Sequence, residues 1–280
     1  MVLAVCMYAI LASTFTIAKA VLSHAKPFFT IGFRMTFAGI LFLAIHYFRN
    51  RSFKFKREDT WLFIRVALFN IYLAFIPEFW ALQYVKSAKV VMLYSLTPFI
   101  VAILSYFLVK ERFNFTKIVG MVIGFAGMVP TLMTHDEIGS IASELCNISL
   151  PEFVLLFAIT SAAYAWFPFK KLLNGGYQPL MIHGFTMLGG GLLALATSFG
   201  VEGFATSPVS NWPSFLGLVL LLILVSNGIF YNLYAHLLKR YTFTVLSFAG
   251  CSTPIFGALY GWAFLGETIT WHYGVAFVCV

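Results

Sequence analysis

Charged side chains are scarce in this sequence. Asp, Glu, Lys and Arg make up 10% of the 280 residues, whereas 61% of the residues are apolar. An ordinary soluble domain carries about 25% charged and roughly 45–50% apolar residues. A soluble chain with so few charges could not cover its surface with polar groups. The composition therefore excludes a soluble globular enzyme, a nucleic-acid-binding protein and a disordered chain, and it predicts an integral membrane protein.

Motifs for metal, redox or nucleotide chemistry are also missing. The four cysteines show no C-x-x-C spacing, and the histidines fit no metal-ligand spacing. No G-x-x-x-x-G-K-[ST] sequence occurs, and no loop is long enough to hold a nucleotide-binding domain. We therefore expect no disulfide framework, no metal, no cofactor and no catalytic residue.

Long apolar runs, each bounded by charged residues, Pro or Gly, predict ten membrane-spanning helices. One span needs about 20 residues, so ten spans leave only short loops in a chain of this length. We expect the tenth span to be truncated at Val280. The predicted spans are residues 2–22, 27–48, 61–84, 88–109, 115–133, 151–172, 179–200, 213–238, 243–265 and 271 onward.

Basic residues are concentrated in alternate loops, which predicts the orientation of the chain. The opposite loops hold only Lys19, Lys26, Lys86 and Lys89. Because cytoplasmic loops carry an excess of Lys and Arg, we expect an inner-membrane protein with both termini in the cytoplasm. The twelve residues of the basic set are Arg49, Arg51, Lys54, Lys56, Arg57, Lys110, Arg112, Lys117, Lys170, Lys171, Lys239 and Arg240.

An internal repeat predicts the architecture. Each copy holds five spans, and because five is odd, the second copy must be inverted relative to the first. The predicted fold class is an all-α integral membrane protein with ten transmembrane helices in two inverted five-helix repeats. Residues 1–133 and 151–280 form the repeats, and 134–150 form an extracytoplasmic connecting loop. The matches are Pro27, Gly32, Phe33, Met35, Gly39 and Leu41 with residues 152 positions later, and Thr97, Pro98, Ala102 and Glu111 with residues 156 positions later.

Two charged residues lie at depth in the predicted spans. Arg34 and Glu78 are both about 10 Å from the outer surface at 1.5 Å per helical residue. Intramembrane charges are costly, so both should face the bundle interior or a wet cavity. Two interpretations stay open. Arg34 and Glu78 form an ion pair that closes the outer half, or Glu78 faces the cavity and binds a cationic group or a proton.

Other polar and aromatic residues complete the candidate substrate-binding set. Pro98 and Pro254 should kink spans four and nine near the centre, and the hydroxyls beside them either bind substrate or bond the backbone carbonyls that the prolines free. Arg65 should snorkel to the headgroups, and we assign it no role. Besides Glu78 and Arg34, the candidates are Lys19, Asn70, Tyr94, Tyr164, Trp166, Asn227, Tyr231 and Ser252.

One set of motifs runs through both halves of the chain. It comprises the segment Ser13-Thr14-Phe15 to Lys19, Arg34 in the second span, and the pattern Ser87-Ala88…Thr97-Pro98…Glu111 with its second copy Thr253-Pro254…Gly266-Glu267. Together with the five-plus-five spans, these motifs resemble the drug/metabolite transporter superfamily, EamA type. The resemblance covers essentially the whole chain and implies a ten-helix metabolite carrier with Lys19 near the outer mouth. It also extends to carriers of intracellular bacteria that exchange S-adenosylmethionine for its demethylated product.

These observations predict a secondary transporter or exchanger that works by alternating access, because inverted repeats around a midplane site are typical of such proteins. A buried carboxylate with aromatic rings suits a cationic or zwitterionic metabolite, such as an amino acid or S-adenosylmethionine. We expect a monomer or homodimer whose partners are the lipid bilayer and a small molecule, with no nucleic acid. The alternatives are a membrane sensor or scaffold and an intramembrane enzyme, which would need acids or histidines that converge at one depth.

Overall fold

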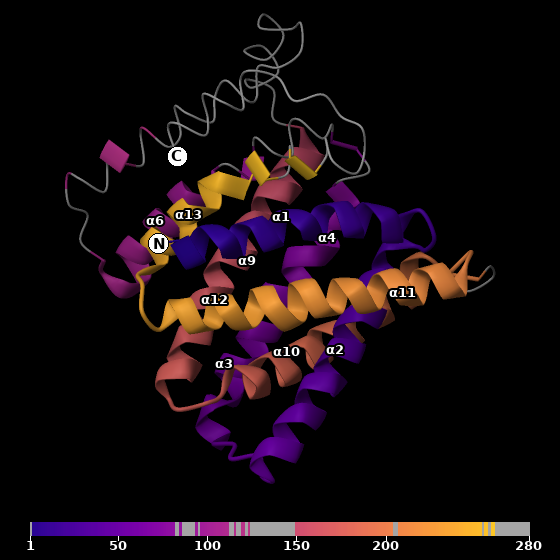
Figure 1. The fold of residues 1–280 in the computed structure, drawn as a ribbon, viewed down its shortest axis with the longest axis horizontal. Coiled ribbons are helices and arrows are strands. Elements are labelled where there is room, and N and C mark those ends of the chain that lie inside the picture. Colours follow the sequence, from indigo (N-terminus) through magenta and orange to yellow (C-terminus); the bar gives the residue numbers. More distant parts are fainter. Residues whose placement is uncertain are drawn as a thin grey trace, which may run out of the picture.

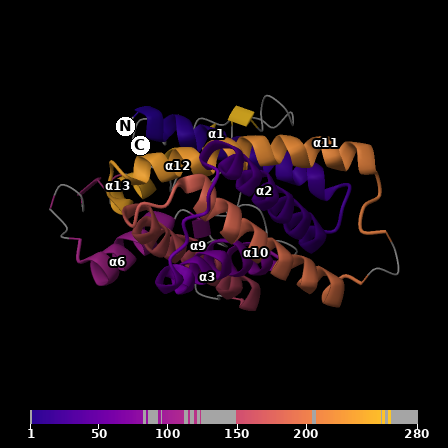
Figure 2. The same cartoon turned by 90° about the horizontal axis from the view of Figure 1, so that it is seen from below.

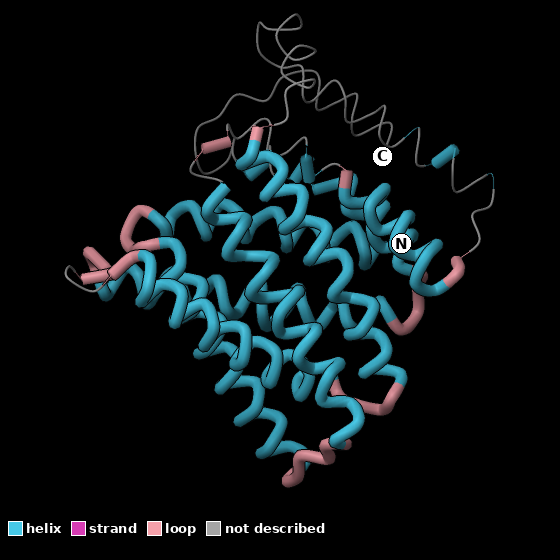
Figure 3. Tube along the Cα trace, turned by 180° about the vertical axis from the view of Figure 1, so that it is seen from behind, coloured by secondary structure: helices cyan, strands magenta, loops and turns pink. Residues whose placement is uncertain are grey.

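In the residues that it describes, the computed structural model consists of helices joined by loops (Figures 1 and 3). Within these residues, six helical stretches are long and apolar enough to cross a membrane, and two shorter apolar helices accompany them. The six long stretches coincide with predicted spans one to three and six to eight, and the two shorter helices cover parts of spans four and nine, whereas most of span five and all of span ten lie outside the described residues. The described residues are 2–81, 84–85, 93–94, 96–111, 115, 119–120, 123, 149–203, 207–253, 255–256 and 259–260.

Several of these stretches change helix type along their length. The third stretch begins with a 3₁₀ turn, η1, and the eighth ends with another, η4, whereas η2 and η3 are π-helical. The elements are α1 Val2–Leu22, α2 Pro27–Asn50, η1 Arg57–Asp59, α3 Thr60–Val66, η2 Ala67–Tyr72, α4 Leu73–Ala81, α6 Thr97–Val109, α9 Leu150–Asn174, α10 Pro179–Val201, α11 Trp212–Leu222, η3 Ile223–Phe230, α12 Tyr231–Leu238, α13 Phe243–Ala249 and η4 Gly250–Ser252.

Helices α2 and α10 cross each other in direct backbone contact (Figure 1). A Cβ atom added to Gly39 would lie 2.5 Å from the Leu188 nitrogen, and one added to Gly191 would lie 2.5 Å from the Thr36 nitrogen. Thr36 and Gly39 are 152 positions before Leu188 and Gly191, which is the offset of the repeat. The contacts between these two helices are therefore reciprocal. Only glycine lets the backbones approach this closely.

A second pair of glycines extends the same crossing. A Cβ atom on Gly32 would lie 2.7 Å from the side chain of Leu195, and one on Gly184 would lie 2.7 Å from that of Leu43. These four residues again pair at the offset of 152. We call the contact around Gly32, Gly39, Gly184 and Gly191 the glycine crossing. The matched glycines of the sequence repeat are thus the residues that join the two helices.

The two π-helical segments interrupt the third and the seventh described stretches. They begin at Ala67 and Ile223, 156 positions apart, which is the second offset found in the repeat. A π-turn leaves backbone carbonyls without their usual α-helical donors, and such turns occur mostly at functional sites. The Ser161 hydroxyl of α9 donates to the Phe69 carbonyl in η2 at 3.2 Å, and the Asn232 amide donates to the Gly228 carbonyl in η3 at 2.9 Å. Side-chain donors thus bond to some of the backbone carbonyls that the two π-helical segments leave without helical partners.

Four loops with basic residues meet at one end of the bundle. The Tyr177 hydroxyl donates to Asp59 at 2.7 Å, and the Lys170 ammonium donates to the Tyr241 carbonyl at 3.5 Å. A cavity lined by Glu111 joins the fourth loop to them. The distribution of basic residues predicts that these four loops lie on the same side of the bundle, and their described residues do lie at one end of it. We call this the basic end, and it comprises residues 51–59, 110–111, 175–178 and 239–242.

The opposite end is held together by loop 23–26 and by residues 202–203 and 207–211. The Glu202 carboxylate accepts hydrogen bonds from the backbone nitrogens of Phe28 and Phe29, at 2.8 and 2.9 Å. It thereby caps the amino end of α2 from the carboxyl end of α10, where a negative charge is favoured by the helix dipole. Further contacts are Lys26 Nζ with the Glu202 carbonyl at 3.0 Å, Ser210 N with the His24 carbonyl at 2.8 Å, and an isolated β-bridge between Ala25 and Val209.

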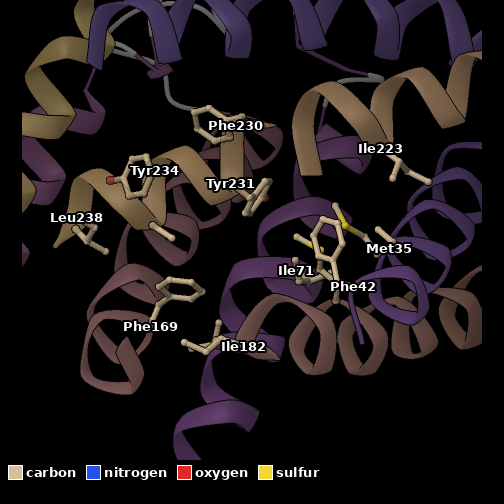
Figure 4. Close-up of a cluster of buried hydrophobic side chains, with 14 of the residues drawn as sticks. Met35, Phe42, Ile71, Phe169, Ile182, Ile223, Phe230, Tyr231, Tyr234 and Leu238 are labelled. Carbon is tan, nitrogen blue, oxygen red and sulfur yellow. The ribbon is translucent and has the colours of Figure 1, made fainter. Parts of the chain in front are cut away.

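A buried apolar cluster fills the space between these helices (Figure 4). Turning the molecule shows that α11 and α12 form one rod beside α1, with α2 and α10 below it (Figure 2). The cluster contains side chains from both sequence halves, so the halves share one core. Its labelled members are Met35 and Phe42 from α2, Ile71 from η2, Phe169 from α9, Ile182 from α10, Ile223 and Phe230 from η3, and Tyr231, Tyr234 and Leu238 from α12.

Candidate functional site

Arg34 is bound by residues of the second sequence half. Its Nε donates to Asn227 Oδ1 at 2.9 Å and its Nη2 to Ser226 Oγ at 2.7 Å, and the side chain is 6% exposed. Its guanidinium carbon lies 5.8 Å from the ring centroid of Phe75 in α4. A charged donor in an apolar core needs such acceptors, because burying it unpaired costs several kcal/mol. Arg34 therefore links α2 to the π-helical segment η3.

Asn227 is itself held by two methionines. Its Nδ2 lies 3.4 Å from the sulfur of Met35 in α2 and 3.4 Å from that of Met187 in α10. These contacts orient the amide so that its oxygen faces Arg34. Met35 and Met187 are matched residues of the repeat, so the amide lies where the crossing helices meet η3. Ser226, the other acceptor, was not among the predicted site residues, and its only sequence signal is a hydroxyl beside Asn227 in an apolar run.

Glu78 in α4 belongs to the same polar group. Its carboxylate accepts a hydrogen bond from the Tyr94 hydroxyl and interacts electrostatically with Arg34. Tyr231 at the start of α12 interacts electrostatically with both charged groups. Arg34 and Glu78, both described residues, form no contact ion pair. We call Arg34, Glu78, Tyr94, Asn227 and Tyr231 the polar cluster.

An aromatic group adjoins the polar cluster. The Trp166 ring of α9 lies 4.1 Å from the Tyr234 ring and 5.8 Å from the Tyr231 ring, centroid to centroid. His183 is fully buried beside them, with its ring 5.4 Å from that of Tyr231. The structure thus places Trp166 beside the polar cluster, and its role in stacking on a ligand stays a prediction. Tyr164 is not, because its ring lies 4.8 Å from Phe69 and lines the cavity at the basic end.

The remaining candidates lie apart or outside the described residues. The Asn70 side chain in η2 is 3% exposed, and its amide nitrogen has no hydrogen-bond partner among the described residues. The Ser252 hydroxyl donates to the Ala249 carbonyl at 2.6 Å, so in this structure it bonds its own helix. Pro98 lies in the first turn of α6, which begins at Thr97, and Leu93 and Tyr94 shortly before it are also helical, so a kink at Pro98 stays a prediction. Pro254 and the side chain of Lys19 lie outside the described residues.

The chemistry of this site follows from its residue types. A carboxylate, a guanidinium, tyrosine hydroxyls and a tryptophan face can together bind opposite charges and a flat ring. Within the described residues, no group of three or more His, Cys, Asp or Glu side chains could hold a metal ion. The arrangement is therefore suited to recognition of a small polar molecule.

Comparisons with known proteins agree on one family. A model of the EamA-like transporter family matches residues 1–133 and 150–280. The S-adenosylmethionine/S-adenosylhomocysteine transporter of Chlamydia muridarum is 31% identical over 259 residues, which are 91% of this chain and 81% of that protein. The protein of the same name from Chlamydia trachomatis serovar L2 is 29% identical over 258 residues, which are 91% of this chain and 79% of that protein.

Likeness extends to a more distant transporter and to a solved structure. An uncharacterized transporter of Bacillus subtilis, YoaV, is 22% identical over 264 residues, covering 92% of this chain and 85% of that protein. A protein crystal structure matches with a TM-score of 0.73 at 18% identity, covering 99% of this chain and 91% of that chain. The latter likeness bears on the fold alone. The family and the named relatives are transporters and not enzymes.

Proposed function

This chain belongs to the EamA-like transporter family of multi-pass membrane proteins, and we propose that it is a secondary transporter or exchanger for a cationic or zwitterionic metabolite. In this proposal two inverted five-helix repeats give alternating access to a site at the polar cluster. The basic end faces the cytoplasm of a bacterial cell, with both termini inside.

The observation that carries this proposal is the position of the polar cluster. Arg34 of the first half is bonded to Ser226 and Asn227 of the second half, and Glu78 lies beside it. A site shared by two halves changes when the halves move against each other, which alternating access requires. The reciprocal contacts of the glycine crossing support a pseudo-two-fold relation between the halves.

Charge and ring chemistry support the substrate class. Glu78 supplies the counter-charge for an ammonium or sulfonium group, because its carboxylate has no contact ion pair with Arg34. Tyr231 and Trp166 supply faces that attract a cation or stack on a purine. S-adenosylmethionine combines a sulfonium, a zwitterion and a purine, and the named relatives from Chlamydia are transporters of it. We propose it, with S-adenosylhomocysteine as the exchanged product, as the first substrate to test.

Transport by purified protein in liposomes tests this function. Liposomes loaded with S-adenosylhomocysteine should take up labelled S-adenosylmethionine without ATP, and empty liposomes should take up much less. Glu78→Gln should raise KM at least about tenfold, because it removes one charge contact to the cation. Glu58→Gln, in an exposed turn at the basic end, should match the wild type.

The same assay can refute the proposal. If the folded wild-type protein transports neither S-adenosylmethionine nor amino acids nor nucleosides, the proposed substrate class is refuted. If KM is unchanged in the Glu78→Gln variant, the polar cluster is not the substrate-binding site. A proton gradient imposed on empty liposomes distinguishes proton-coupled uptake from exchange.

A further inference from the structure

A second polar hollow lies at the basic end, separate from the polar cluster. It is a cavity of about 400 Å³ between α3, the end of α6, α9 and the start of α13, and we call it the basic cavity. This volume is within the roughly 300–1,000 Å³ of small-molecule sites. None of its lining residues belongs to the polar cluster.

The walls of the basic cavity carry more positive than negative charge. Arg65, Lys170 and Lys171 line it, and Glu111 is the acidic residue among its lining. Arg65 lies in the last turn of α3, and the sequence suggested only that its side chain reaches the headgroups. Its place in this cavity depends on α9 packing against α3, a contact between residues about 100 positions apart. No local pattern signals that contact.

Aromatic rings hold two of these cations and leave their N–H groups available. The Lys170 nitrogen lies 4.7 Å from the Phe243 ring centroid, and its hydrogen bond to the Tyr241 carbonyl is 3.5 Å long. The Arg65 guanidinium carbon lies 5.2 Å from the Trp61 ring centroid. In the described part of the chain neither cation has a contact ion pair. Cation–π contact orients a side chain without using its hydrogen-bond donors.

Such donors suit an oxyanion. Arg binds a carboxylate or phosphate with two parallel N–H groups, and Lys adds a compact point charge. The Phe243 and Tyr164 rings give the cavity apolar walls beside these donors. A molecule with a negatively charged group and an apolar or flat part would therefore match the lining.

We propose that the basic cavity is an oxyanion site in which Arg65 and Lys170 bind a carboxylate or phosphate group. Two sources share this chemistry. One is the carboxylate of the transported metabolite as it reaches the basic end, and this part of the inference rests on the proposed function. The other is the phosphate of an anionic lipid headgroup.

Equilibrium binding in nanodiscs tests the site. The probes are S-adenosylhomocysteine and its decarboxylated analogue, in discs of phosphatidylcholine alone and in discs that also contain phosphatidylglycerol. In the phosphatidylcholine discs, Lys170→Gln and Arg65→Gln should each weaken S-adenosylhomocysteine binding about tenfold, the worth of one charge-assisted contact. Both variants should bind the decarboxylated analogue as the wild type does. Lys239→Gln removes an exposed cation at the same end and should change neither affinity.

Each other result has a definite meaning. If Lys170→Gln leaves binding of the probe unchanged but abolishes retention of phosphatidylglycerol, seen by native mass spectrometry, the site stands and the occupant is the lipid. If both measurements match the Lys239→Gln control, the oxyanion site is refuted. If the wild type binds no probe, the proposed substrate fails, while lipid retention still tests the cavity. Lys170→Arg and Arg65→Lys keep the charge and should restore part of the binding, which separates this role from misfolding.

Discussion

The glycine crossing makes a sharp prediction about stability. Replacement of Gly39 or Gly191 by Ala would place a Cβ atom 2.5 Å from a backbone nitrogen of the facing helix. Ordinary contact needs roughly 3.5 Å or more, so α2 and α10 would have to separate by about 1 Å. Backbone atoms in a helix cannot rotate away as the end of a side chain can. We therefore expect each variant to lose about 1–3 kcal/mol of folding free energy, the usual cost of overpacking a core.

A matched control is available in α11. A Cβ atom on Gly217 would meet nothing within 4 Å. There Gly→Ala removes only backbone freedom, which should stabilise the helix by about 0.5–1 kcal/mol. Gly→Ala should thus lower the free energy of unfolding at the glycine crossing and raise it at Gly217. Because Thr36–Gly191 and Leu188–Gly39 are reciprocal contacts, the two crossing variants should also lose similar amounts.

Thermal unfolding in detergent, followed by tryptophan fluorescence, measures these differences. At about 2–4 °C per kcal/mol, Gly39→Ala and Gly191→Ala should lower Tm by roughly 2–12 °C, and Gly217→Ala should raise it by about 1–4 °C. The double variant should lose less than the sum, because helices separated by one methyl group already make room for the other. Wild-type Tm in either crossing variant would refute the close approach of α2 and α10.

Three other substitutions can be measured by the same thermal ramp. Glu202→Gln removes the charge and one of the two oxygens that cap α2, and it should cost about 0.5–2 kcal/mol, whereas Glu58→Gln should leave Tm unchanged. Asn227→Leu leaves the Arg34 guanidinium without one acceptor in an apolar core and should cost about 1.5–3 kcal/mol, the worth of a hydrogen bond to a charged group. Trp166→Ala should cost about 3–5 kcal/mol, because it leaves a hollow beside two tyrosine rings, and Trp166→Phe should cost clearly less.

Most of the helices could be predicted from the sequence, and the physical reason is simple. Apolar runs of membrane length leave few alternatives to a helix, because no water satisfies the backbone there. Proline in the first turn marks where a helix begins, and α2 and α10 do begin at Pro27 and Pro179. Pro98 shows the limit of this signal, because α6 begins at Thr97 although Leu93 and Tyr94 shortly before it are also helical.

The candidate site was only partly predictable. Arg34 and Glu78 were identified because charge within an apolar run is costly, and that argument needs no structure. Their partners depend on contacts between distant residues: Arg34 and Ser226 are 192 positions apart. Even the equal depth of Arg34 and Glu78 suggested a direct pair that the structure does not contain. Neither π-helical segment has a hydrophobic periodicity that distinguishes it from an α-helix. The polar residues Asn70 and Asn227 are the one sequence signal at these two segments.

The two π-helical segments make the geometry of the polar cluster depend on the number of residues in η2 and η3 as well as on their chemical type. A π-turn holds about one residue more than an α-turn, and one residue rotates everything downstream by about 100°. Glu78 follows η2 and Tyr231 follows η3, so each owes its direction to the extra residue before it. Deleting a single apolar residue from Ala67–Tyr72 would turn Glu78 away from Tyr94 while leaving hydropathy almost unaltered. The lengths of η2 and η3 therefore determine which way α4 and α12 turn the side chains that they contribute to the polar cluster.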